Sequence, residues 1–339
     1  WGHLLEMKIA SVIGATGFVG SAIVRTLCGR GYTVRCSSRN PAEAAWLKDL
    51  APSPEMIEIC ELNLSNGEPS APVFDQMKEM MKDSTGVFFC AGFEKQEQAT
   101  IDYMTSNALA TIRAARESKV GCVVLTSSGG STNPPGLTNE IPKNEIIHWS
   151  DPDAQVAANK FSPAAKTLME LRSLEEVGRN KANEIVNVEL ARNSPRLIIM
   201  NPNLILGPQA QPGPVKGNSL PWIVKILKKE SMSEKIPNDS MSIIDVRDLA
   251  ELHVSAMEKE DASGRYFGVN KSFTWEEILS TFEQVYPKYT MPPRFEGEAA
   301  VPTQFDHTRK KTLNVELRDL RTTLQDLVAF LVERQQIEP

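Results

Sequence analysis

The stretch Lys8-Ile-Ala-Ser-Val-Ile-Gly14-Ala-Thr-Gly-Phe-Val-Gly20 decides the fold of this 339-residue chain. Its first six residues form an apolar run that predicts a strand, and a helical pattern follows the glycines as far as Arg30. In this context Gly14 permits a tight turn, Gly17 lets the backbone approach a pyrophosphate, and Gly20 allows the helix to pack closely on the strand. The helix N-terminus offers unpaired N–H groups to phosphates. The stretch therefore predicts a dinucleotide-binding unit; an ordinary strand–turn–helix is the alternative.

Strand and helix patterns alternate along the first 200 residues. Helical patterns cover residues 98–118 and 167–189, and further strands are predicted at residues 33–38, 56–61, 86–90, 121–126 and 196–201. Such alternation is typical of an α/β fold with a Rossmann-type, doubly wound parallel sheet that is covered on both faces.

The texture of the chain changes after Asn201. Five prolines between residues 202 and 221 predict irregular chain over the surface. Asp245 is the expected N-cap of a helix over 246–258, and a strand at 265–269, a helix at 274–285 and a final helix with leucines spaced from 317 to 331 follow. We expect an NADP-binding Rossmann domain at residues 7–200. Residues 201–335 are expected to form mainly a smaller substrate lobe, with elements that return to the core.

Composition excludes several classes of protein. A net charge of −6 and a pI near 5.5 argue against nucleic-acid binding, which needs a basic surface to neutralise phosphates. The four histidines are isolated, so we expect no metal site. No C-x-x-C spacing occurs among the cysteines, which we interpret as reduced core residues of an intracellular protein: Cys28, Cys36, Cys60, Cys90 and Cys122.

The chain shows neither a transmembrane-length apolar run nor a signal peptide. It begins with Trp1 rather than Met, which leaves two expectations open. The protein acts in the cytoplasm, or inside an organelle after removal of a presequence.

The end of the second predicted strand indicates which dinucleotide is bound. NAD-selective sites place an acidic residue about twenty residues beyond the glycine loop, where it binds the ribose hydroxyls. No Asp or Glu occurs between Met7 and Ala42, and Arg39 stands just beyond the strand. A guanidinium at this point can bind a 2′-phosphate, so we predict NADP(H); a merely solvated arginine is the alternative.

Several motifs together resemble the extended short-chain dehydrogenase/reductase family. Within it they are similar to the subgroup that contains dihydroflavonol reductases and cinnamoyl-CoA reductases, and the resemblance runs from about Lys8 to the last helix. Besides the glycine loop, the motifs are Arg39-Asn-Pro41, Val124-Leu-Thr-Ser-Ser128, Lys166-Thr-Leu-Met-Glu170, Asn201-Pro-Asn-Leu-Ile-Leu-Gly-Pro208 and Gly264-Arg-Tyr-Phe267.

The resemblance implies hydride transfer from NADPH to a carbonyl, with a Tyr-x-x-x-Lys pair supplying the proton. Ser128 matches the serine that holds the carbonyl oxygen. Lys166 matches the lysine that holds the nicotinamide ribose and lowers the pKa of the tyrosine. The tyrosine itself is missing, because Ser162 stands four residues before Lys166. A serine hydroxyl is a much poorer proton donor than a phenol, whose pKa is about 10.

The resemblance also assigns the remaining contacts. Asn63 replaces an acidic residue that meets the adenine, and it can still form a hydrogen bond there. Asn133 matches a substrate-contacting position, although a turn residue is an equal alternative. The full set expected to bind the cofactor is Gly14, Thr16, Gly17, Phe18, Val19, Gly20, Arg39, Asn63, Leu64, Cys90, Ala91, Gly92, Lys166, Pro202, Asn203, Leu204 and Ile205.

Three functions remain open. The chain is an NADPH-dependent carbonyl reductase that acts on a small substrate, with its proton drawn from a water held by Ser128 and Ser162 or from His148. Alternatively it is a catalytically impaired NADP(H)-binding structural or regulatory subunit of a larger assembly. A nucleotide-sugar epimerase or dehydratase suffers equally from the missing tyrosine and has no motif in its support.

Overall fold

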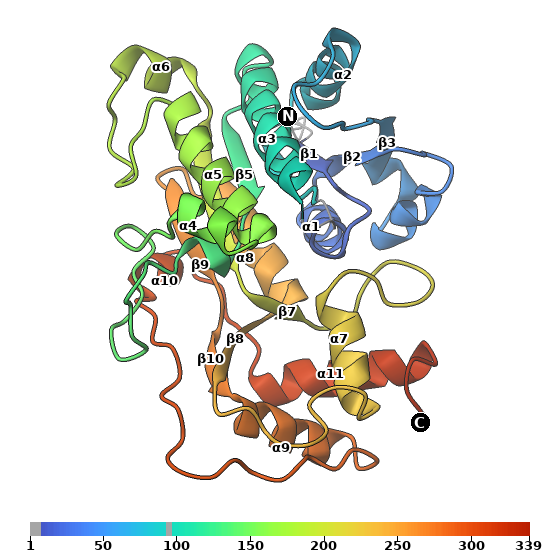
Figure 1. Ribbon diagram of the computed structural model, residues 1–339. Helices are drawn as coiled ribbons and strands as arrows, with labels where there is room; N and C mark the ends of the chain where they lie inside the picture. The colour runs from blue at the N-terminus through green and yellow to red at the C-terminus, as the bar shows by residue number, and fades with distance from the viewer. Residues whose placement is uncertain (1–7, 93–96) are drawn as a thin grey trace.

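A seven-stranded sheet forms the centre of the molecule (Figure 1). The computed structural model describes residues 8–92 and 97–339. All six neighbouring strand pairs of this sheet are parallel. The predicted Rossmann-type, doubly wound sheet is confirmed, with the order β3 (Ile57–Glu61), β2 (Thr33–Ser38), β1 (Ile9–Ile13), β4 (Gly86–Phe89), β5 (Cys122–Thr126), β6 (Arg196–Pro202) and β9 (Gly264–Gly268).

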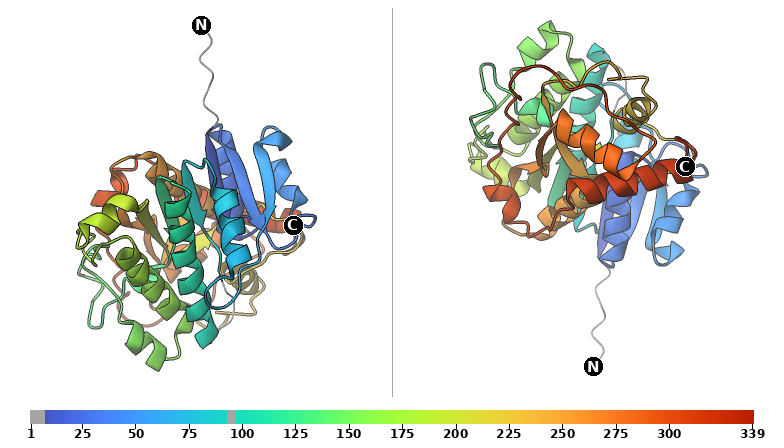
Figure 2. Two further views of the ribbon diagram at one scale, coloured as in Figure 1. Left: turned by 90° about the horizontal axis from the view of Figure 1, so that it is seen from above. Right: turned by 90° about the horizontal axis from the view of Figure 1, so that it is seen from below.

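Helices cover both faces of the sheet, as the two views of Figure 2 show. Side chains that alternate along β1 enter two separate cores, with Val12 in one and Ile13 in the other. Burial on both faces explains why the central strands are apolar throughout rather than alternating. The first core is covered by α1 (Phe18–Gly29) and α8 (Val246–Glu258), and the second by α2 (Ala71–Met81), α3 (Gln98–Glu117) and α5 (Phe161–Glu176).

A smaller lobe is built around a second, three-stranded sheet. Its strand order is β10 (Lys271–Thr274), β8 (Ser240–Asp245) and β7 (Leu204–Leu206), and a third apolar core joins it to α7 (Ser219–Leu227), α9 (Trp275–Val285) and α11 (Leu320–Glu333). The predicted N-cap is confirmed, since the Asp245 side chain accepts a hydrogen bond from the Arg247 amide at 2.9 Å. Although they follow β7, α8 and β9 pack against the elements of the seven-stranded sheet.

Short elements complete the chain and lie in the connections. They are η1 (Ala45–Leu50), η2 (Pro54–Met56), η3 (Gly129–Ser131), α4 (Pro152–Ala157), α6 (Val188–Asn193) and α10 (Thr308–Lys311). No helix in the described ranges is both long and apolar enough to cross a bilayer.

The helix predicted over residues 167–189 is wrong at both ends. The structure begins α5 at Phe161 and ends it at Glu176. Gly178 then adopts a φ of +70°, and a Cβ there would lie 2.6 Å from the Asn187 carbonyl oxygen. The chain therefore turns back on itself after α5, because only glycine fits this left-handed position.

Two further expectations need correction. The proline-rich segment does not simply cross the surface, since Gln209 and Gln211 are buried. All five cysteines are free, but Cys60 and Cys90 are only partly buried and are not full members of the core.

Candidate active site

The glycine loop forms a close-packed cradle at the carboxyl end of β1. Gly14 adopts a φ of +85°, and a Cβ there would lie 2.6 Å from the Ala91 amide nitrogen. A Cβ on Gly20 would lie 2.1 Å from the Gly14 carbonyl oxygen, so the first turn of α1 presses directly on the loop. Ser37 fixes the turn by accepting a hydrogen bond from the Gly14 amide at 2.9 Å. Two of the three glycines are thus required by contacts within the protein itself.

The N-terminus of α1 is left open for an anion. Gly17 is its N-cap residue, so no side chain caps the first amides, and the first turn holds no acidic residue. Unpaired N–H groups together with the positive end of the helix dipole favour a phosphate at this point. The cradle and the open amides fit a dinucleotide pyrophosphate.

Two predicted adenine-end residues follow β2 and β3, which are neighbours in the sheet. Arg39 is exposed and forms no ion pair with the part of the chain that the structure describes. Asn63 is also exposed, and its side-chain amide donates to Glu61 Oε1 at 3.2 Å. Both side chains are therefore accessible to a ligand at this edge of the sheet.

Lys166 reaches the carboxyl end of β5 from α5. Its Nζ donates to the Thr126 carbonyl oxygen at 2.7 Å. Burial lowers the pKa of Lys166 to about 8, because desolvation disfavours the ammonium form. The pKa of Lys166 therefore lies closer to neutral pH than that of a solvated lysine.

Cys90 belongs to the same strand edge. The Thr126 hydroxyl lies 3.3 Å from Cys90 Sγ, and burial raises the pKa of this thiol to about 11. Thr126 Oγ1 also lies 2.9 Å from Nε2 of the buried His253, whose Nδ1 is 2.7 Å from the Leu249 carbonyl oxygen. His253, which no sequence pattern indicated, joins the end of β5 to α8 on the opposite face of the sheet.

Ser128 and Ser162 lie on segments that pack together. Ser128 caps η3, and its Oγ accepts a hydrogen bond from the Gly130 amide at 3.1 Å, which leaves the hydroxyl proton to be donated. A Cβ on Gly130 would lie 3.4 Å from Ser128 Oγ and 3.3 Å from the side chain of Pro163. The start of α5, with Ser162 in its first turn, therefore lies beside Ser128, and Lys166 follows one turn later.

The segment from Pro202 to Ile205 passes the same edge. Asn203 is exposed, and a Cβ on Gly129 would lie 3.5 Å from its Cβ. Asn201, which directly precedes this segment, donates to the Ser128 carbonyl oxygen at 3.1 Å. From the opposite lobe the buried Gln211 donates to the Thr16 carbonyl oxygen at 3.3 Å, a contact that the sequence did not predict.

A buried ion pair holds the chain on both sides of Ser128. Glu170 Oε2 lies 2.7 Å from Arg265 Nε, and the two side chains are 0% and 2% exposed. Glu170 Oε1 also accepts hydrogen bonds from Ser127, Ser131 and Asn201. Glu170 and Arg265 both stand in motifs quoted above, but the sequence did not indicate that they pair.

Asn133, the residue predicted to contact substrate, lies in the loop between η3 and α4. Asn133 Nδ2 donates to the Gly129 carbonyl oxygen at 3.1 Å, and its Oδ1 accepts from Lys143 Nζ. His148 Nδ1 accepts a hydrogen bond from the Asn144 amide at 2.9 Å. Among the described contacts of His148, none reaches Ser128, Ser162 or Lys166, so the geometry does not favour it as the proton source.

Residues 10–269 match the NAD dependent epimerase/dehydratase family. The chain belongs to this family. Cinnamoyl-CoA reductase 1 from Arabidopsis thaliana is 28% identical, covering 98% of this chain and 91% of that protein. Dihydroflavonol 4-reductase from Callistephus chinensis is 28% identical, covering 86% of this chain and 77% of that protein. These relatives confirm the resemblance to the extended reductase subgroup.

Solved reductases share the fold of this family member. Vestitone reductase from Medicago sativa superimposes with a TM-score of 0.77 at 21% identity, covering 97% of this chain and 99% of that one. The yeast methylglyoxal/isovaleraldehyde reductase complexed with NADPH gives a TM-score of 0.78 at 22% identity, covering 98% and 100%.

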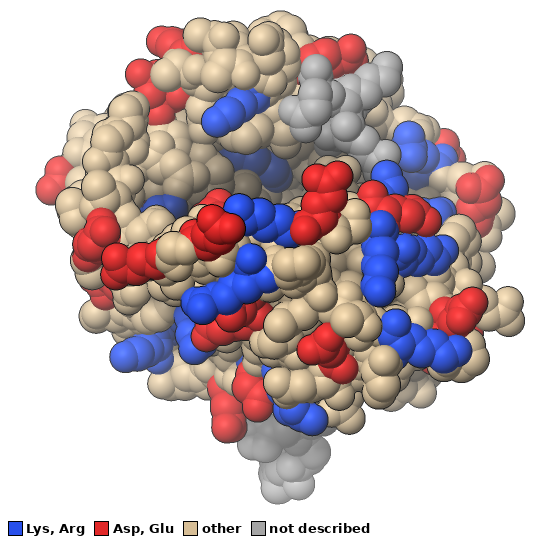
Figure 3. Space-filling model, turned by 60° about the horizontal axis from the view of Figure 1, so that its bottom comes forward, with Lys and Arg blue, Asp and Glu red and all other residues tan. Residues whose placement is uncertain are grey.

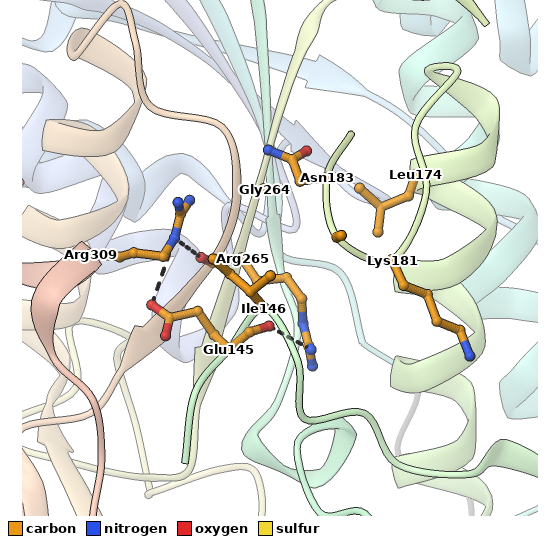
Figure 4. Close-up of a pocket in the computed structure, with 9 residues that line it drawn as sticks. Glu145, Ile146, Leu174, Lys181, Asn183, Gly264, Arg265 and Arg309 are labelled. Atoms are coloured by element: carbon orange, nitrogen blue, oxygen red, sulfur yellow. Dashed lines mark hydrogen bonds and ion pairs between the residues drawn. The ribbon is translucent and has the colours of Figure 1, made fainter. Parts of the chain in front are cut away.

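A separate pocket of about 50 Å³ is lined by Glu145, Arg265 and Arg309 together with Asn183 (Figure 4). Glu145 lines it with a buried carboxylate whose nearest cation is Arg309, with Nε at 3.8 Å. Burial raises the pKa of Glu145 to about 7. Arg265 donates to the Glu145 carbonyl oxygen at 2.8 Å, so the pocket wall is joined to the ion pair that supports Ser128.

Proposed function

We propose that this protein is an NADPH-dependent reductase that converts a small carbonyl compound to an alcohol. One observation carries the proposal. Lys166, with a pKa lowered to about 8, is hydrogen-bonded to the carbonyl oxygen of Thr126. Thr126 ends β5 two residues before Ser128, at the same sheet edge as the glycine loop. Ligands of open α/β sheets bind at this edge.

The chain's own residues would hold the cofactor at its two ends. The open amides of α1 and the cradle around Gly14 suit the pyrophosphate, and Arg39 supplies a guanidinium for a 2′-phosphate. When bound, NADPH supplies a hydride. Arg39→Asp should weaken NADPH binding at least tenfold more than NADH binding, as measured by fluorescence titration. Equal losses for the two cofactors would refute the assignment of Arg39.

The proton must come from a group other than tyrosine. Reduction adds a hydride to the carbonyl carbon and a proton to the oxygen, which leaves an alcohol. The Ser128 hydroxyl is free to donate to the substrate oxygen and to orient it. We propose that the Lys166 ammonium supplies the proton through a water beside Ser162, because its lowered pKa makes it a far better acid than a serine.

The named relatives support a reductase over a cofactor-binding subunit. Both curated relatives described above are named as reductases, and each is matched over most of its length. Ser162 at the tyrosine position is the single observation that favours a catalytically impaired subunit. The two functions make opposite predictions for turnover.

The test is NADPH oxidation by the native chain with a panel of aliphatic and aromatic aldehydes and ketones. We expect slow but measurable turnover, and we expect Ser162→Tyr to increase it at least tenfold by restoring a phenol next to Lys166. No turnover by the native chain, together with activity in Ser162→Tyr, would refute the proposal and favour the cofactor-binding subunit.

A further inference from the structure

The loop between η3 and α4 carries a lysine, Lys143, that no part of the proposed reaction uses. Lys143 Nζ donates to Asn133 Oδ1, and Asn133 Nδ2 in turn donates to the Gly129 carbonyl oxygen at 3.1 Å. Gly129 directly follows Ser128. The ammonium group is therefore separated from the backbone next to Ser128 by a single side chain.

The position of Lys143 is fixed by the C-terminal part of the chain. Its amide donates to the Gln304 carbonyl oxygen at 2.9 Å, and its carbonyl oxygen accepts from the Asp306 amide at 2.7 Å. Lys143 Nζ lies 5.9 Å from the centre of the Phe305 ring, which itself packs edge-on against Phe267 at 4.9 Å. Two chain segments far apart in sequence thus hold the lysine against an aromatic wall.

The charge of Lys143 is not balanced by the protein. No carboxylate within the described ranges forms an ion pair with its ammonium group. The backbone of Asp306 is hydrogen-bonded to that of Lys143, but the Asp306 carboxylate accepts from the Asn144 side chain at 3.0 Å and from the Thr308 amide at 2.9 Å. Burial lowers the pKa of Lys143, which means that the protein alone solvates the charge poorly. A bound anion would remove this deficit.

Asn133 is exposed and Lys143 is partly exposed, so a ligand can reach both side chains from solvent. Figure 3 shows a hollow in the face that it presents, with Lys or Arg side chains visible inside it. A half-buried cation favours a ligand with a negative group, because a partly desolvated ion pair is stronger than an exposed one. The neighbouring Phe305 ring favours a ligand that is flat.

We propose that Lys143 selects carbonyl substrates that carry an anionic group, a carboxylate or a phosphate, at the end remote from the reacting carbonyl. This inference rests on the proposed function, because it places the reacting carbonyl at Ser128. Asn133 spaces the two ends of the substrate, with Phe305 against its flat part. An uncharged substrate of the same shape leaves the ammonium group unpaired and binds more weakly.

Calorimetry on the NADP⁺-saturated full chain tests the proposal without requiring turnover. The probes are 4-formylbenzoate, 4-formylphenyl phosphate and the uncharged methyl 4-formylbenzoate. We expect at least one of the two anions to bind about tenfold or more tightly than the ester, the size of effect that a charge-assisted hydrogen bond supplies. The tighter of the two anions identifies the anionic group.

Lys143→Gln removes the charge but keeps an N–H donor for Asn133, and it should reduce the preference for the anion to about twofold or less. Lys143→Arg should retain the preference. Lys271→Gln is the matched control, since Lys271 is exposed and lies 4.7 Å from the Phe273 ring in the other lobe. NADP⁺ affinity and thermal unfolding report whether each variant is folded.

Equal binding of anions and ester by the native chain would overturn the proposal, as would a preference that survives in Lys143→Gln. Selective anion binding that depends on Lys143, without reduction of the aldehyde by NADPH, would uphold the proposal and refute the proposed function. Binding measurements thus test the role of Lys143, whereas aldehyde reduction tests the proposed function.

Discussion

Replacing Glu170 by Gln tests whether the buried ion pair supports the active-site edge. The substitution preserves the shape of the side chain, and the amide oxygen can still accept from Ser131 and Asn201. It removes the negative charge 2.7 Å from Arg265 Nε. Arg265 is then left charged, 2% exposed and without its counter-ion.

The geometry sets the size of the effect. At an effective dielectric constant of about 20, two unit charges at this separation attract by roughly 6 kcal/mol, and desolvation offsets part of this. Removing one partner of a buried pair costs about 3–5 kcal/mol, because the other charge remains buried. Stacking of Arg265 on Trp149, with its guanidinium carbon 3.7 Å from the ring centre, persists and keeps the loss at the lower end of this range.

Urea unfolding followed by circular dichroism measures the loss. Glu175→Gln is the matched control, since it breaks an ion pair with Arg172 on the same helix. The side chains of Glu175 and Arg172 are 63% and 58% exposed, so the loss should be less than about 1 kcal/mol. NADPH affinity should change little, because the glycine loop does not contact Glu170. If Glu170→Gln costs no more free energy of unfolding than Glu175→Gln, the reasoning is wrong.

Three other perturbations probe separate features. Gly20→Ala should lower NADPH affinity at least tenfold in a fluorescence titration, because the new Cβ would lie 2.1 Å from the Gly14 carbonyl oxygen; Gly29→Ala, with open space around it, should leave affinity unchanged. Turnover should fall as the pH rises through about 8, where Lys166 loses its proton, and a profile that stays flat to pH 10 would exclude Lys166 as the acid. The raised pKa of Glu145, about 7, predicts that the native chain loses stability as the pH rises from about 4.5 to 7, since its carboxyl must ionise in a buried site. Urea unfolding should show Glu145→Gln gaining on the order of 3 kcal/mol relative to the native chain at pH 8 but not at pH 4.5, and the same difference at both pH values would refute this account.

The fold could be predicted because its determinants are local. A strand, a glycine loop, a helix and a second strand within the first 38 residues establish the βαβ unit, and the side chain of Asp245 marks the start of α8. The end of α5 could not be predicted, because the left-handed turn at Gly178 depends on contact with Asn187, which the helical pattern does not reveal. Helix propensity predicted a longer helix, whereas a tertiary contact ends α5 at Glu176.

The motifs of the candidate site can be seen in the sequence, but the contacts between its residues cannot. The sequence identified Ser128, Lys166 and the missing tyrosine, and the structure brings the two residues to one strand edge. Gln211 on Thr16 is a contact across 195 residues, and no local pattern signals it. The pairing of Lys143 with Asn133 arises within an irregular loop that is held by the distant C-terminal segment, so it too required the structure.

The proposed reaction is hydride transfer to a carbonyl at a site that lacks tyrosine. The most direct measurement incubates the native chain with NADPH deuterated at C4, in separate samples for each face of the nicotinamide, and a panel of aldehydes and ketones. Mass spectrometry then examines the alcohols. We expect an alcohol that carries one deuterium on the former carbonyl carbon from one face only, with formation slowing above about pH 8. Tight NADPH binding without any labelled alcohol across the panel would contradict it.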